Sequence, residues 1–103
     1  MAKRLDILDV YRDFRKKDPG YIHAFGDAEF FTFYMSDAHR INEALPDVPI
    51  ERGNRCEQIR VHKLAFFPLA ARLKAQGVKV AMVGRKLQPS GVYTYSVTGR
   101  SDD

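Results

Sequence analysis

The aromatic segment at residues 29–35 holds the side chains best suited to binding a ligand. Its sequence, Glu-Phe-Phe-Thr-Phe-Tyr-Met, is typical of a β-strand, and side chains two residues apart in a strand point to the same face. Phe31 and Phe33 therefore share one face, and Phe30 and Thr32 share the other. If the first pair enters the core, Phe30 and Thr32 face a partner. An exposed ring can wedge between base steps or stack on unpaired bases; the alternative is that Phe30 packs beneath the first helix, because most phenylalanines in small domains are buried.

Basic side chains are concentrated in one third of the chain. Residues 1–51 carry 7 basic and 10 acidic side chains, whereas residues 52–86 carry 9 basic and 1 acidic. Such asymmetry is typical of proteins that contact the phosphate backbone of nucleic acids, although it also keeps a small domain in solution. The cations that we single out as candidate phosphate ligands are Arg52, Arg55, Arg60 and Lys63.

The sequence offers little for catalysis or metal binding. The histidines His23, His39 and His62 are scattered, and Cys56 is the only cysteine. Cys56 and His62 could form a nucleophile and its base, but no oxyanion-hole donor accompanies them. A Cys/His zinc site would need further ligands, and the glycine-rich phosphate loop, G-x-S-x-G and H-E-x-x-H motifs are missing. We therefore expect a protein that is not an enzyme and uses no metal or other cofactor.

Length and hydropathy bound the remaining possibilities. The 103 residues fit one domain, with a frayed tail expected at 99–103. No apolar run approaches the roughly 18 residues of a membrane span, and the charged N-terminus lacks the apolar stretch of a secretory signal. A single cysteine allows no intramolecular disulfide. We expect a cytoplasmic protein without a membrane partner.

The spacing of apolar residues predicts alternating helices and strands. Helices are expected over 5–17, over 36–45 with Ser36 or Asp37 as the cap, and over 66–76 with Pro68 in the first turn. Strands are expected over 21–25, 29–35, 48–52, 58–62, 78–83 and 92–98. In the last strand, Tyr93 and Tyr95 either form a stacking platform or pack against a helix. This order predicts an α/β fold, with a mixed five- to six-stranded sheet packed by about three helices.

Two segments have a spacing found in a known recognition domain. In Ile22–Ala38, two strands lead through Phe30 and further aromatic residues into a helix that starts at Asp37-Ala38. In Leu73–Val83, a helix that contains Leu is followed by Gln-Gly and then by Lys-Val-Ala. Together they resemble the N-terminal mismatch-recognition domain of the MutS-type DNA mismatch-repair proteins, over about residues 5–99. The ATPase, lever and clamp domains of that family have no counterpart in these residues.

The resemblance implies a role in DNA binding. In that family a Phe-x-Glu motif acts on DNA: the Phe wedges beside a mispaired base, and the Glu hydrogen-bonds that base. Phe30 falls on the Phe, and Thr32 stands where the family has Glu; its hydroxyl can still form a hydrogen bond. We expect a DNA-binding accessory module for mismatched, distorted or single-stranded DNA, with Phe30 and Thr32 probing the bases and the four cations on the phosphates. The alternative is a module for protein interaction or oligomerisation that keeps the fold, with a protein partner or a second copy.

Overall fold

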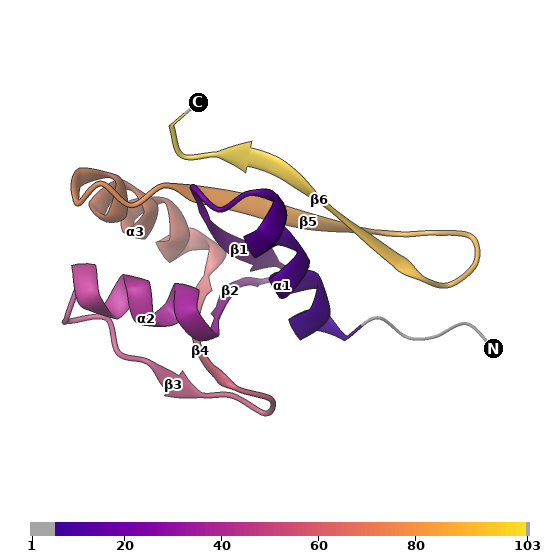
Figure 1. The fold of residues 1–103 in the computed structure, drawn as a ribbon, viewed down its shortest axis with the longest axis horizontal. Coiled ribbons are helices and arrows are strands. Elements are labelled where there is room, and N and C mark those ends of the chain that lie inside the picture. Colours follow the sequence, from indigo (N-terminus) through magenta and orange to yellow (C-terminus); the bar gives the residue numbers. More distant parts are fainter. Residues whose placement is uncertain (1–5, 103) are drawn as a thin grey trace.

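The computed structural model describes residues 6–102 and contains three helices and six strands (Figure 1). The helices are α1 (Ile7–Lys17), α2 (Met35–Ala44) and α3 (Lys63–Ala75). The strands are β1 (Ile22–Gly26), β2 (Phe30–Tyr34), β3 (Glu51–Arg52), β4 (Glu57–His62), β5 (Val80–Leu87) and β6 (Tyr93–Arg100). None of these helices is long and apolar enough to cross a membrane, as far as the described residues go.

All six strands form one mixed sheet in the order β3-β4-β2-β1-β5-β6. β1 and β5 are parallel, and the other neighbouring pairs are antiparallel. The parallel pair requires a crossover, which α2, β4 and α3 supply between the β1–β2 hairpin and β5. This topology confirms the predicted single-domain α/β fold with a mixed sheet and three helices.

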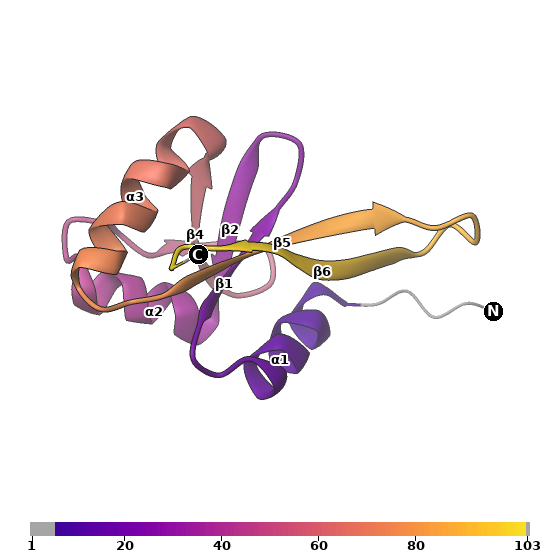
Figure 2. The ribbon, with the colours of Figure 1, turned by 90° about the horizontal axis from the view of Figure 1, so that it is seen from above.

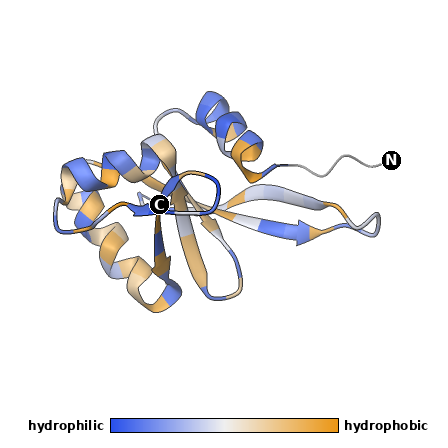
Figure 3. Ribbon diagram, turned by 90° about the horizontal axis from the view of Figure 1, so that it is seen from below, coloured by the Kyte–Doolittle hydropathy of each residue, from blue (hydrophilic) through white to orange (hydrophobic). Residues whose placement is uncertain are grey.

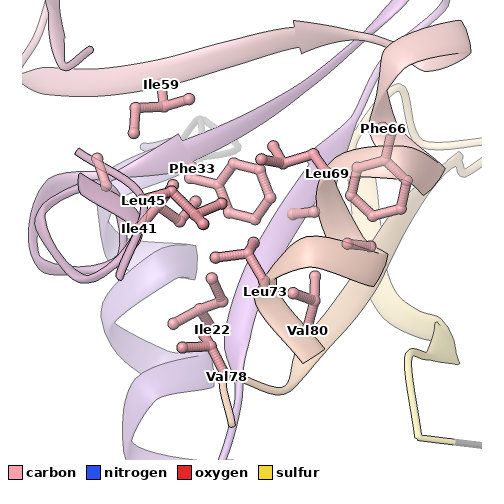
Figure 4. Close-up of a cluster of buried hydrophobic side chains, with 13 residues drawn as sticks. Ile22, Phe33, Ile41, Leu45, Ile59, Phe66, Leu69, Leu73, Val78 and Val80 are labelled. Carbon is pink, nitrogen blue, oxygen red and sulfur yellow. The ribbon is translucent and has the colours of Figure 1, made fainter. Parts of the chain in front are cut away.

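Two hydrophobic clusters lie on the two faces of the sheet. The larger cluster joins α2 and α3 to the sheet, with Phe33, Phe66 and Leu73 among its fully buried members (Figure 4). The smaller cluster joins Tyr11 of α1 to Phe25 of β1 and further residues. We call these the α2/α3 face and the α1 face. Because the side chains of a strand alternate, each residue of β2, β4 and β5 can be assigned to one face from its neighbours.

The two C-terminal strands form an arm that extends beyond the rest of the sheet (Figures 1 and 2). Their pairing runs from Ala81 opposite Arg100 to Leu87 opposite Tyr93, with a bulge next to Met82. Leu87 and Tyr93 near the tip are 56% and 38% exposed. The arm therefore carries large side chains away from both hydrophobic clusters.

Two predicted helix starts are wrong in detail. The second helix begins at Met35, whose φ of +48° turns the chain out of β2, and no side chain caps it. The third helix begins at Lys63, where the preceding His62 accepts a hydrogen bond from the Leu64 N–H through Nδ1 (3.1 Å). Pro68 consequently lies in the second turn of α3 and not in the first.

The predicted frayed tail is instead held in the sheet. Gly99 and Arg100 belong to β6, and the Ser101 N–H donates to the Val80 carbonyl (2.8 Å) while Ser101 Oγ accepts from the Val80 N–H (3.0 Å). Hydrogen bonds thus extend the pairing beyond the last strand residue. Asp103, and the start of the predicted first helix at residue 5, lie outside the described residues.

Candidate nucleic-acid interface

Phe30 is the first residue of β2 and belongs to neither hydrophobic cluster. Its β2 position is opposite His62 in β4, and Thr32 is opposite Arg60. The Arg60 guanidinium carbon lies 4.4 Å from the centre of the Phe30 ring, and the His62 ring packs edge-on against it at 5.6 Å. The Phe30 side chain is half-buried and adjoins a cation; its contact with a ligand stays a prediction.

Asp27 fixes the loop that carries Phe30. Its Oδ1 accepts hydrogen bonds from the backbone N–H groups of Phe30 (2.9 Å) and Glu29 (3.0 Å). The bond from Phe30 is the largest influence on this carboxyl, and together with the Glu29 bond and the charges of Arg85 and Lys63 it lowers the pKa of Asp27 against the effect of partial burial. The ring is therefore presented from a braced turn with positive charge nearby.

The structure does not make Thr32 accessible. Thr32 shares the face of Phe30 as predicted, but it is 7% exposed and lies beside Tyr34 on the same strand face. Tyr34 in turn packs against Phe25 and Tyr11 in the α1 cluster. A hydroxyl in this position cannot reach a base without opening the sheet face, so the expectation that Thr32 contacts the ligand is corrected.

Arg52 lies on the other face of the sheet. Arg52 in β3 is opposite Glu57 in β4. The Glu57 carboxylate lies 3.4 Å from the His39 ring of α2. Glu57, and Arg52 opposite it, therefore lie on the α2/α3 face. Arg52 is also five strand positions from the residue opposite Phe30, roughly 17 Å along β4. It therefore cannot share a compact ligand with Phe30.

Arg55 is held by an ion pair with Asp6, the residue that caps α1. The same carboxylate accepts a hydrogen bond from the Leu8 N–H (3.0 Å). Arg55 thus ties the β3–β4 turn to the start of α1. Its charge is compensated, and its position as a free phosphate ligand is not supported.

Lys63 lies next to the start of β2, where its backbone N–H donates to the Glu29 carbonyl, but its side chain lies on the opposite face of the sheet from Phe30. It is the first residue of α3, and its ammonium group lies 5.5 Å from the centre of the Phe31 ring. Phe31 stacks on Phe66 at 4.2 Å in the α2/α3 cluster. Of the predicted cations, only Arg60 is in direct contact with Phe30, while Lys63 adds charge at the same end of the sheet.

The β5–β6 arm adds a second pair of an arginine and an aromatic ring, which the sequence reasoning did not assign to the site. The Arg85 guanidinium carbon lies 4.5 Å from the centre of the Tyr93 ring. Arg85 lies two residues after Val83 of the α1 cluster, and Tyr93 two residues before Tyr95, which contacts Phe25. Both pairs therefore lie on the α1 face. The expected stacking platform of Tyr93 and Tyr95 already pointed to Tyr93 as a surface ring. Tyr95, in contrast, packs against Phe25 in the α1 cluster.

These five residues form what we call the sheet-end surface: Phe30, Arg60, His62, Arg85 and Tyr93. Among residues 6–102, neither of its arginines forms an ion pair. Planar guanidinium groups stacked on rings can meet phosphates with their edges and bases with their faces. The surface can therefore attract a polyanion and stack on its bases.

The imagined pairing of Cys56 with His62 does not form. Cys56 precedes the first residue of β4 and His62 is its last, so they are roughly 20 Å apart along the strand. The His62 Nδ1 is also engaged at the start of α3. Within the described range, no group of three or more His, Cys, Asp or Glu side chains is placed to hold a metal ion.

Two buried titratable groups serve the fold. His23 is fully buried, and its Nε2 lies 3.1 Å from Asp18 Oδ2, which also accepts from Arg100 at 3.0 Å. Burial lowers the pKa of His23 and outweighs the opposing effect of Asp18. Asp37, 5% exposed, accepts the His23 N–H (3.0 Å) through Oδ2, and burial raises its pKa to about 6. Because β2 ends at Tyr34 and α2 begins at Met35, the Asp37 side chain, and not a strand carbonyl, accepts the hydrogen bond of the His23 N–H in β1.

Comparison with known protein families gives no match for this chain, and comparison with curated proteins gives no significant one.

Proposed function

We propose that the chain is a nucleic-acid-binding module that contacts its ligand through the sheet-end surface. The observation that carries the proposal is the Phe30 ring, which lies outside both clusters with the Arg60 guanidinium 4.4 Å from its centre. A half-buried ring on a braced turn loses little conformational freedom on binding. Stacking of such a ring on a base contributes about 1–3 kcal/mol.

The proposal keeps the role of Phe30 that the resemblance to the mismatch-recognition domain implies, but it changes the supporting residues. Thr32 is replaced by His62 and Arg60 as the polar groups next to the ring. Arg85 and Tyr93 extend the surface along the arm. DNA whose bases are unstacked, at a mismatch, a distortion or in a single strand, is the ligand class that we propose, because the ring can reach such bases with little further unstacking.

The contribution of charge to binding can be tested with two arginines that lie on opposite faces of the sheet. Fluorescence anisotropy of labelled single-stranded, mismatched and fully paired oligonucleotides, at a series of salt concentrations, gives the affinity and its salt dependence. Arg60→Gln should weaken binding and reduce the slope of log K against log salt by about 0.7–0.9, the value for one lost phosphate contact. Arg52→Gln removes the same charge from the α2/α3 face and is the matched control.

Two outcomes would refute the proposal. The first is the absence of binding at low salt. The second is an equal effect of Arg60→Gln and Arg52→Gln, since this would mean that only net charge matters and that the surface around Phe30 has no special part in binding.

A further inference from the structure

The outer side of α3 exposes an apolar stripe. Leu64 and Phe67 are 85% and 66% exposed, the highest values among the exposed large hydrophobic side chains of the described residues. Together with Ala71 and Lys74 they follow a spacing of three, four and three residues, which places them along one side of a helix. The same spacing marks the contact positions of paired helices. In the ribbon coloured by hydropathy, most of α3 is in the apolar colours, whereas α1 is largely hydrophilic (Figure 3).

A hollow of about 340 Å³ adjoins this stripe, between α3 and the sheet. Phe67 and Ala71 line it from the helix, and Val80 and Met82 line it from β5. Its lining is mostly apolar, and Lys74 also contributes to it. The stripe and the hollow together form what we call the α3 groove, which can receive side chains of the size of Leu or Phe. It lies on the α2/α3 face, away from the sheet-end surface.

Charge identifies the kind of occupant. Helix α3 contains no acidic residue, and its cations are Lys63, Arg72 and Lys74. Arg72 is paired in a bidentate manner with Asp47 (2.8 and 3.0 Å), whereas Lys74 forms no ion pair within residues 6–102. A second copy docked helix to helix would bring a basic α3 against a basic α3, and like charges oppose such a contact. A helix with carboxylates beside its apolar side matches both the shape and the charge.

We propose that the α3 groove binds an amphipathic helix of a partner protein, with acidic residues flanking the apolar side. One large apolar side chain of that helix enters the hollow beside Phe67, and a carboxylate meets Lys74. The inference is independent of nucleic-acid binding, because it uses the opposite face of the sheet. It gives the chain a way to be attached to a larger assembly while the sheet-end surface stays open.

The test uses two synthetic peptides of about 18 residues, long enough to hold a helix. Both carry Leu and Phe at the three-four spacing; in one the flanking residues are Glu, and in the other they are Lys. Each is titrated into isotope-labelled protein, and amide NMR shifts report the site. We expect the acidic peptide to shift Ala71, Lys74 and Met82, and the Lys peptide to shift none of them.

Variants make the test specific. Phe67→Ala should weaken the acidic peptide by about tenfold, as for the loss of a central interface residue, whereas Phe30→Ala should leave its affinity unchanged. Lys74→Glu should weaken the acidic peptide and allow the Lys peptide to bind. Because Phe67 and Lys74 are exposed, both variants should keep the wild-type spectrum elsewhere.

Each other outcome overturns the proposal. Shifts confined to the sheet-end surface, or equal binding of both peptides, would show that the groove has no preference for an acidic helix. A dimer in sedimentation equilibrium that Phe67→Ala dissociates would make the occupant a second copy. Loss of oligonucleotide binding or of binding to anionic vesicles on Phe67→Ala would make the groove a surface for those ligands instead.

Discussion

Replacing Asp37 with Asn should stabilise the protein at neutral pH. The Asp37 carboxylate is 5% exposed and accepts one hydrogen bond, from the backbone N–H of His23. An Asn side chain keeps an oxygen acceptor for that N–H and removes the cost of holding a charge away from water. The side chain has nearly the same shape, so the packing at the start of α2 is retained.

The size of the effect follows from linkage. Burial, acting against the His23 hydrogen bond and the charge of Arg15, raises the pKa of Asp37 from 3.8 to about 6. The folded state therefore holds the proton more tightly than the unfolded state, and the stability that this provides is present below pH 3.8 and lost as pH rises through about 6. A shift of this size corresponds to about 3 kcal/mol. At pH 7.5 Asp37→Asn should recover about 1–3 kcal/mol of this loss, and near pH 4 the difference should fall below about 1 kcal/mol.

Urea unfolding followed by circular dichroism at several pH values measures the difference. Asp47→Asn is a control of opposite sign, because hydrogen bonds from Arg72 lower the pKa of this exposed carboxyl; its removal should not stabilise the protein at pH 7.5. A variant at position 37 that is less stable than the wild type at pH 7.5, or whose advantage does not change with pH, would refute the reasoning.

Three further predictions concern other parts of the molecule. Asp27→Asn should tighten oligonucleotide binding by about twofold to fivefold at low salt, measured by anisotropy, because the acceptor for the Phe30 N–H remains while a negative charge near Arg85 and Lys63 is removed. Gly77→Ala should lower the free energy of unfolding by about 1 kcal/mol in urea titrations, because Gly77 has a φ of +78°. In a proton NMR titration, the ring of His23 should gain its proton only below pH 6.5, because burial lowers its pKa, and stability should correspondingly fall as pH decreases below 6.5 through this group.

The sequence predicts the secondary structure well where apolar spacing is regular. The period of α1, the aromatic alternation of β2 and the glycine after α3 each have a local cause, and the structure shows all three elements. Helix starts are harder to predict, because they depend on partners that are distant in sequence. Asp37 resembles a cap, but it binds the backbone of β1, and the cap of α3 is the imidazole of His62.

The candidate site is only partly predictable for a similar reason. Alternation places Phe30 and Thr32 on one face, but it does not show that Thr32 is buried there while Phe30 is only half-buried. The charge count identifies a basic segment, but not the register that sends Arg52 to the other face or the ion pair that holds Arg55 to Asp6. The contribution of the arm was missed because β5 extends four residues beyond the predicted strand, to Leu87.

The most direct test of the sheet-end surface compares two phenylalanines on opposite faces. The affinity for a single-stranded and for a mismatched oligonucleotide is measured for the wild type, for Phe30→Ala and for Phe67→Ala. If the Phe30 ring meets the bases, Phe30→Ala should weaken binding by about 5- to 150-fold, which corresponds to 1–3 kcal/mol of stacking, and Phe67→Ala should bind as the wild type does. Unchanged affinity and mismatch preference in Phe30→Ala, with a wild-type spectrum, would contradict the account.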